Sequence, residues 1–206
     1  MGLTVRNAMN ADLESLVSIH ISAFPGFFLT NMGRRFLKQY YYGYLEMDET
    51  LLVAVDNTDK IVGFVAGLKD SEGYYLHMKK RWYRFIIPVA LAMLNFDLLS
   101  TCTQRILTIL RSNKVNEEMH VPVGFHELTS IAVSPAARQV GAGKSLMGAY
   151  LESVKTIAGI KGVFLTTDSK ENANVQQFYK SMGFRVIAEF VQGEKRKMSA
   201  YSLNFN

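Results

Sequence analysis

The stretch Val133-Ser134-Pro135-Ala136-Ala137-Arg138-Gln139-Val140-Gly141-Ala142-Gly143-Lys144-Ser145 decides the fold of this chain. Residues 125–133 before it predict a strand, and an amphipathic run over about 143–158 predicts a helix. Glycines in the turn between them let the backbone approach an anion closely. The first amides of the helix have no partner within it and lie at the positive end of its dipole. We therefore expect the turn to bind a phosphate or pyrophosphate, although an ordinary strand-to-helix turn also fits.

Strands and helices are predicted on both sides of this unit. Asn10 is expected to cap the first helix, which Phe24-Pro25-Gly26-Phe27-Phe28 interrupts. The other expected helices cover about 30–45, 73–113 in two parts, and 172–182, and the other strands cover 3–8, 51–55, 61–68, 162–167, 184–191 and 197–205. This order predicts an α/β (α+β) sheet in a single domain over 1–206, with a helical insertion at about 73–113.

Composition agrees with one domain that has a sizeable core. The chain has 206 residues, of which 49% are hydrophobic and 20% charged, with a formal net charge of +5. No nucleic-acid-binding motif accompanies this modest charge, so no nucleic acid partner is predicted. Cys102 is the only cysteine, which excludes an intrachain disulfide and a cysteine metal cluster. We read it as a small buried hydrophobic residue, and we predict no metal site.

An apolar run over 85–94 follows four basic residues, Lys79, Lys80, Arg81 and Arg84. The run is too short to span a bilayer, so no transmembrane segment is predicted. A buried helix fits it, and a helix in peripheral contact with a membrane surface is the alternative. Residues 1–10 lack the apolar core of a signal peptide, so the expected compartment is the cytoplasm.

The glycine turn has two functional interpretations. Gly143-Lys144-Ser145 resembles the end of a P-loop, but that motif needs glycine where Arg138 stands. In contrast, Arg138-Gln139-Val140-Gly141-Ala142-Gly143 resembles the [RQ]-x-x-G-x-[GA] motif of the GNAT N-acetyltransferase family. The resemblance implies a mixed, mostly antiparallel sheet, splayed near Val133 and Leu165 at the cofactor site, with helices on both faces. It also implies acetyl-CoA as cosubstrate, held by Arg138, Gln139, Val140, Gly141, Ala142, Gly143 and Lys144.

A second motif follows after an intervening strand. Residues 172–184 resemble the later family segment N-x-x-A-x-x-x-Y-x-x-x-G-F, with Val175 in place of the alanine. Asn172 and Tyr179 are seven residues apart and share one helical face. A helix cap is the structural alternative for Asn172, and a core tyrosine is the alternative for Tyr179. The resemblance covers 125–187 well and the N-terminal half only in its order of elements.

The resemblance implies direct acetyl transfer to an amine, with Glu127 as the candidate general base and Tyr179 as the candidate acid. A base needs a pKa nearer neutrality, which partial burial supplies. His126 and His120 are rivals, and a regular strand turns His126 to the face opposite Glu127. Backbone groups of Ile131 and Val133 are expected to bind the pantetheine arm as an added strand would.

The acceptor is expected to be a small-molecule amine. The segment His20–Thr30, with the aromatic residues Phe36, Tyr40 and Tyr41 beyond it, resembles family members linked to bacterial surface-polysaccharide synthesis. This suggests an amino sugar, while core packing also explains the aromatics. The alternative acceptors are a protein amine and a polyamine amine. The alternative function is an acyl-CoA sensor that catalyses no turnover. A homodimer is a possible assembly.

Overall fold

The structure is a computed structural model that describes residues 2–85, 121–170, 172–192 and 196–205. Its strands are β1 (Thr4–Asn7), β2 (Thr50–Val55), β3 (Ile61–Leu68), β4 (Phe125–Val133), β5 (Gly162–Asp168), β6 (Arg185–Gln192) and β7 (Arg196–Asn204). Its α-helices are α1 (Leu13–Ala23), α2 (Phe28–Asn31), α3 (Arg34–Glu46), α4 (Ser71–Lys80), α7 (Ala142–Lys155) and α8 (Ala173–Ser181), with 3-10 turns at Asn10–Asp12 and Pro135–Val140. Cys102, His120 and most of the apolar run over 85–94 lie outside the described residues.

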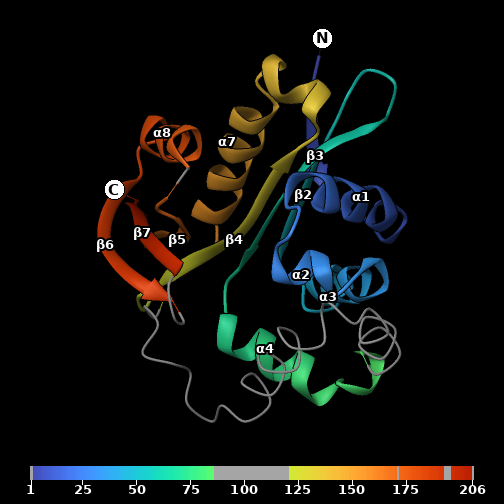
Figure 1. Ribbon diagram of the computed structural model, residues 1–206, viewed down its shortest axis with the longest axis horizontal. Coiled ribbons are helices and arrows are strands. Elements are labelled where there is room, and N and C mark those ends of the chain that lie inside the picture. Colours follow the sequence, from blue (N-terminus) through green and yellow to red (C-terminus); the bar gives the residue numbers. More distant parts are fainter. Residues whose placement is uncertain (1, 86–120, 171, 193–195, 206) are drawn as a thin grey trace.

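The strands form one sheet in the order β1-β2-β3-β4-β5-β7-β6 (Figure 1). Every neighbouring pair is antiparallel except β4 and β5, which run parallel. This confirms the mixed, mostly antiparallel sheet, and it is incompatible with the all-parallel sheet of a P-loop protein.

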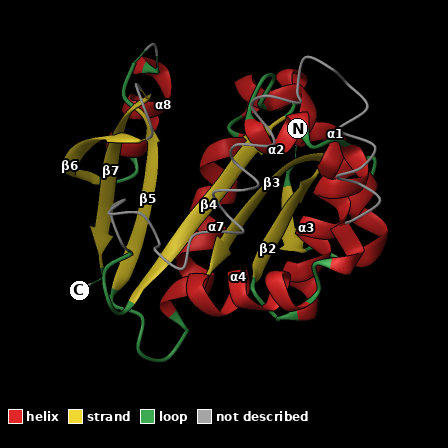
Figure 2. Cartoon of the chain, turned by 60° about the horizontal axis from the view of Figure 1, so that its bottom comes forward, coloured by secondary structure: helices red, strands yellow, loops and turns green. Residues whose placement is uncertain are grey.

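The sheet divides in its middle. β4 and β5 pair over three residues only, the last pair being Glu127 with Phe164. Beyond that pair the two strands diverge, as Figure 2 shows. Leu165 pairs only with Tyr201 of β7, and Val133 pairs only with Gly63 of β3. The predicted splay near Val133 and Leu165 is therefore confirmed.

Two hydrophobic cores lie on the two faces of this sheet. One face carries α7 and α8, and its core includes Leu146, Tyr150 and Tyr179. The other carries α1 and α3, whose residues Leu16 and Tyr41 are fully buried against it. Helices on both faces were predicted, and burial of these apolar stripes supplies the main stabilisation of the fold.

Two local predictions in the N-terminal half are wrong. Asn10 does not cap α1, because it lies within a 3-10 turn and Asp12 accepts the hydrogen bond from the Met9 amide at 2.7 Å. The expected helix over 30–45 is divided, because Gly33 adopts a φ of +85° between α2 and α3. A left-handed backbone ends a helix, and glycine adopts it without steric cost.

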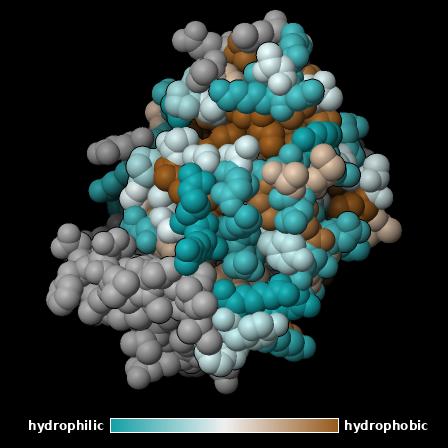
Figure 3. All heavy atoms as spheres, turned by 90° about the vertical axis from the view of Figure 1, so that its right-hand side faces the viewer, coloured by the Kyte–Doolittle hydropathy of each residue, from teal (hydrophilic) through white to brown (hydrophobic). Residues whose placement is uncertain are grey.

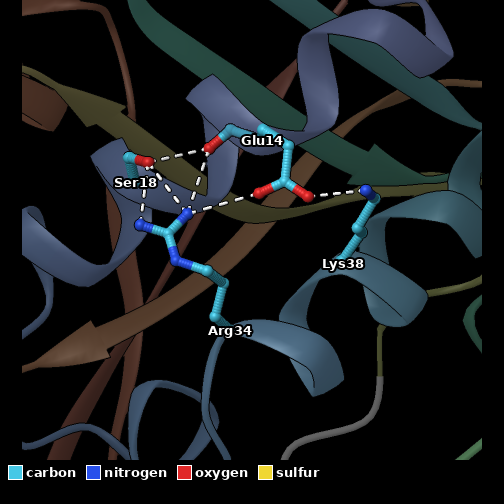
Figure 4. Close-up of polar contacts among 4 residues, drawn as sticks. All are labelled: Glu14, Ser18, Arg34 and Lys38. Atoms are coloured by element: carbon cyan, nitrogen blue, oxygen red, sulfur yellow. Dashed lines mark hydrogen bonds and ion pairs between the residues drawn. The ribbon is translucent and has the colours of Figure 1, made fainter.

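Surface contacts join α1 to α3 at their outer side (Figure 4). The Lys38 ammonium lies 2.5 Å from a carboxylate oxygen of Glu14, and the Arg34 guanidinium donates to Ser18 Oγ at 3.0 Å. Exposed pairs of this kind contribute little to stability, because solvent and salt screen the charges. The face over these helices is mostly hydrophilic, with hydrophobic atoms showing between the polar side chains (Figure 3).

The insertion expected from Gly73 begins as a helix, two residues earlier than predicted. α4 starts at Ser71, and the Asp70 carboxylate accepts a hydrogen bond from the Gly73 amide at 2.9 Å. Past its C-terminal end, Arg81 and Arg84 both pair with Glu46 of α3, which ties this segment to the domain. Within the described ranges, no helix has the length and apolarity needed to cross a bilayer.

Candidate active site

The glycine turn is placed as predicted, between the 3-10 turn Pro135–Val140 and α7. Gly141 has a φ of +80°, a left-handed conformation that favours glycine, and an added Cβ there would meet no atom within 4 Å. No side chain caps α7 in the described part of the chain. Arg138 and Lys144 are exposed beside this turn. The free helix amides and two cations therefore suit a phosphate group.

The other predicted residues of this turn differ in their surroundings. Ala142 is fully buried in the core, and Val140 is 41% exposed. Gly143 faces the ring of Phe178, with its nearest atom 3.7 Å from the position of an added Cβ. The side chain of Gln139 lies outside the described atoms. Backbone amides, more than side chains, are thus what this turn offers to a ligand.

The backbone of β4 presents free hydrogen-bonding groups to the gap in the sheet. The Ser134 amide donates to the Val62 carbonyl at 2.8 Å. In an antiparallel pair, alternate residues point their N–H and C=O groups away from the partner strand. Val133, opposite Gly63, and Ile131, opposite Val65, therefore direct these groups away from β3. These N–H and C=O groups face the side from which β5 has diverged, where a ligand that binds like an added strand could form hydrogen bonds with them.

A bulge at Thr129 interrupts the pairing of β4 with β3. Ala66 is opposite Ser130, whereas Gly67 is opposite Leu128, so Thr129 is the extra residue. It lies on the edge of β4 that pairs with β3, not on the edge from which β5 diverges. Because side chains alternate along a strand, one extra residue reverses the face of everything before it.

The bulge decides where Glu127 points. In a regular strand Glu127 would share the face of Val133, which packs toward α7. Instead it lies on the opposite face, where the Ser71 hydroxyl of α4 donates a hydrogen bond to its Oε2 atom. Among the described residues nothing bonds its Oε1 atom, which is also not sealed from solvent.

Burial raises the pKa of Glu127 above that of an exposed glutamate, and the Ser71 hydrogen bond opposes this shift. The side chain is only partly buried, so it remains reachable from the surface. A carboxylate with a raised pKa and one free oxygen has the properties of a general base.

His126 points to the other face, as predicted. It is fully buried, and its Nδ1 atom lies 2.7 Å from the Tyr150 hydroxyl while Nε2 lies 3.2 Å from Thr50 Oγ1. Burial lowers the pKa of its ring to about 4. Both nitrogens are engaged and the ring is neutral, so the structure argues against His126 as the base.

Tyr179 and Asn172 lie at the two ends of α8. The ring of Tyr179 is 7% exposed and packs against Phe184 and Tyr201. Burial raises the pKa of its phenol, which keeps the proton on the oxygen at neutral pH. The Asn172 amide occupies the cap position but donates to Thr167 Oγ1 at 2.8 Å and to the Asp168 carbonyl at 3.0 Å. It holds the loop between β5 and α8 and does not cap the helix.

Sequence reasoning missed the residues that surround Glu127. Ser71 is 56 positions away in the chain, and its hydrogen bond depends on where α4 packs. Thr129 Oγ1 lies 2.8 Å from the Tyr44 hydroxyl, which is 3.1 Å from that of Tyr40. Tyr40 and Tyr44 are core residues, which agrees with core packing as the alternative explanation of the aromatic residues in this segment. The proximity of Tyr40 to α4 was not visible in any local pattern.

Asp168 at the end of β5 pairs with Arg196 through two contacts, at 2.6 and 2.8 Å. The Arg196 guanidinium lies 5.4 Å from the ring centre of Phe27, which links β7 to the segment before α2. Among the described residues, no group of three or more His, Cys, Asp or Glu is placed to hold a metal ion.

A cavity of about 400 Å³ lies elsewhere, against α1 and α3. It is lined by Asn10, Leu13, Lys38, Gln39, Tyr42 and Arg84, none of which is a predicted site residue. Its two cations are already paired, Lys38 with Glu14 and Arg84 with Glu46. We therefore assign the chemistry to the gap between β4 and β5.

Comparisons with known proteins agree with this geometry. Residues 103–184 match the model of the acetyltransferase (GNAT) family. A histone acetyltransferase HPA2-related protein from Corynebacterium glutamicum is 18% identical, with a TM-score of 0.65 over 98% of this chain and 96% of that one. Ard1 from Thermoplasma volcanium is 16% identical, with a TM-score of 0.62 over 99% and 98%. The acetyltransferase yncA from Salmonella typhimurium, solved with acetyl-CoA, is 14% identical, with a TM-score of 0.61 over 100% and 95%. Among curated protein sequences, none matches this chain.

Proposed function

We propose that this chain, whose residues 103–184 match the model of the acetyltransferase (GNAT) family, is a member of that family and transfers an acetyl group from acetyl-CoA to a primary amine by direct attack. The observation that carries the proposal is Glu127, a carboxylate with one free oxygen where the sheet opens. Around it, the backbone of β4 and the amides of α7 provide the groups that a pantetheine arm and a pyrophosphate need.

Acetyl-CoA supplies the activated acetyl group and a thiol leaving group. The α7 amides after Gly141, with Arg138 and Lys144 nearby, would hold its pyrophosphate, and Ile131 and Val133 would bond the pantetheine arm through their backbone. Support for this cosubstrate comes from yncA of Salmonella typhimurium, a similar fold described with acetyl-CoA as its cofactor. Holding both substrates together supplies a large part of the rate in such reactions.

Glu127 would remove the proton that the attacking nitrogen must lose. Its Oε1 atom takes a proton from the ammonium form of the acceptor, so that the free amine adds to the thioester carbonyl. After addition, the nitrogen of the tetrahedral intermediate would lose its second surplus proton to water. When the carbon–sulfur bond breaks, the Tyr179 hydroxyl would give its proton to the departing sulfur and later regain one from solvent. The raised pKa of Tyr179 keeps this proton in place until the sulfur carries negative charge.

The acceptor we favour is an amino sugar, consistent with the resemblance of the His20–Thr30 segment to proteins of bacterial surface-polysaccharide synthesis. The neutral hydroxyl of Ser71 lies beside Glu127 and can still accept a hydrogen bond, which suits a polyhydroxylated ligand. Two further carboxylates in this region already accept backbone hydrogen bonds, Glu49 from Lys69 and Asp70 from Gly73. A polyamine would need additional unpaired carboxylates.

An amine panel tests this proposal. Thiol release from acetyl-CoA is measured with free and nucleotide-linked amino sugars, spermidine, and peptides that offer an N-terminal or lysine amine. We expect saturable turnover with an amino sugar. Turnover with spermidine or a peptide alone would correct the acceptor and keep acetyl transfer. Tight coenzyme A binding by calorimetry without turnover of any amine would favour the sensor alternative.

A further inference from the structure

Glu127 is held by a residue outside the part of the chain that matches the family model. Ser71 is the first residue of α4, and its hydroxyl donates to Oε2 of Glu127. The family match begins at residue 103, so nothing in that match assigns a role to Ser71. The contact joins β4 to the start of the helical segment after β3.

The two carboxylate oxygens of Glu127 have different surroundings. Oε2 accepts from Ser71, whereas no described residue bonds Oε1. A carboxylate without such a contact rotates about its last torsion with little restraint. With one oxygen fixed, the other is held in a single direction, and pre-orientation of this kind lowers the entropy cost of reaching the reactive geometry.

We propose that Ser71 is a positioning residue for Glu127: its hydroxyl fixes one carboxylate oxygen so that the other is presented to the acceptor amine. The inference rests on the proposed function of Glu127 as base. It assigns to α4, beyond that function, the task of orienting the base.

The hydrogen bond also favours the charged form of Glu127, which is the form that accepts a proton. Its loss raises the pKa of the carboxyl, so the acidic limb of the pH–rate profile moves to higher pH. The other titratable groups that interact electrostatically with Glu127 are the phenols of Tyr40, Tyr75 and Tyr150, from α3, α4 and α7. Burial is the main cause that raises the pKa of Tyr40 and of Tyr150, whereas the pKa of Tyr75 is raised mainly by its electrostatic interaction with Tyr40. All three phenols therefore stay neutral in the pH range where Glu127 titrates.

The test compares Ser71→Ala with Ser71→Thr, which keeps the hydroxyl, and with Ser181→Ala. Ser181 is an exposed helical serine whose hydroxyl bonds only its own helix, at Phe178 O. Single-turnover rates are measured against pH with the acceptor found in the amine panel. For Ser71→Ala we expect the acidic limb to move up by about one to two pH units, the size expected for a hydrogen bond to a charged group. Ser71→Thr should restore the limb, and Ser181→Ala should not move it.

A second readout does not depend on activity. The titration of the Glu127 carboxyl carbon, followed by NMR in the full chain, should shift upward by the same amount in Ser71→Ala. An unchanged midpoint and an unchanged limb would overturn the inference. A lower rate at every pH with no shift would also overturn it, since it would show a structural role. If Glu127→Gln itself keeps the wild-type rate, the base assignment fails, whereas a normal Ser71→Ala beside an impaired Glu127→Gln removes only the role of Ser71.

Discussion

At the scale of single residues, the environment of Glu127 separates it from an ordinary surface glutamate. It is partly buried, its pKa is raised by that burial, and one oxygen is bonded while the other is free. The base role therefore gives a specific expectation for pH dependence.

Glu127→Gln should lower the single-turnover rate by about 100-fold to 10,000-fold where the acceptor amine is mostly protonated. The loss should shrink as pH rises, because free amine then accumulates without help from a base. Rates are measured under single-turnover conditions so that slow product release does not mask the chemical step. Rates close to wild type across the whole pH range would remove Glu127 from the mechanism.

Tyr179→Phe tests the proposed acid. The ring should still pack against Phe184 and Tyr201, so folding and cofactor affinity should change little. The single-turnover rate should fall by about 100-fold or more, because the departing sulfur loses its proton donor. Thermal unfolding and coenzyme A calorimetry serve as controls. A rate equal to wild type would leave Tyr179 as a core residue only.

At the scale of elements, the unit β4–turn–α7 combines three features in 31 residues of sequence: a bulge, a free strand edge and an uncapped helix start. Only the turn has a sequence pattern that was recognisable beforehand. Its geometry depends on Gly141, which has a left-handed φ. A β-branched residue cannot adopt this φ without strain.

Gly141→Val should weaken coenzyme A binding by about tenfold or more, because strain of about 1–3 kcal/mol drives the turn out of the shape that presents its amides. Gly148→Val is the matched control. An added Cβ at Gly148 also meets nothing within 4 Å, but this glycine has no positive φ. Calorimetry reports affinity, and thermal unfolding reports stability. Unchanged affinity in a folded Gly141→Val protein would contradict the assignment of the pyrophosphate to this turn.

At the scale of the whole molecule, each face of the sheet contains one buried neutral histidine. His20 of α1 faces α3, and its Nδ1 atom is 2.7 Å from the Tyr41 hydroxyl. Its Nε2 atom is buried and has no hydrogen-bond partner in the described part of the chain. His126 is its counterpart toward α7. Burial lowers the pKa of each ring to about 4, so both contribute stability above the unfolded pKa of about 6.5 that is lost as pH falls toward 4.

Replacing His20 by Phe should therefore flatten the acid side of the stability curve. The contribution of His20 is roughly 3 kcal/mol between pH 6.5 and 4 as an upper value. Glu49 and Glu127 have raised pKa values and act with the opposite sign, so the measured quantity is the difference between wild type and His20→Phe. Urea unfolding at several pH values gives this difference. Parallel curves for the two proteins would show that His20 does not titrate with folding.

The sequence predicted the elements around the two motifs well because each motif is local. The turn at Gly141 and the helix of Tyr179 carry their own spacing within a dozen residues. The bulge at Thr129 was not predictable, because apolar and polar residues alternate acceptably in β4 with or without an extra residue. Ser71 was missed since its contact with Glu127 depends on tertiary packing. Val175, which replaces the alanine of the second motif, is 38% exposed.

The open edge of β4 has a consequence that hydrogen exchange would record residue by residue. The amides of Ser130 and Ala132 point toward β3, whereas those of Ile131 and Val133 point into the gap. In the free protein, exchange should therefore alternate along the strand, slow at the even positions and fast at the odd ones. Coenzyme A should slow the fast positions and remove the alternation, which NMR can follow amide by amide. Equal protection of all four amides in the free protein would mean that another part of the chain already occupies this edge.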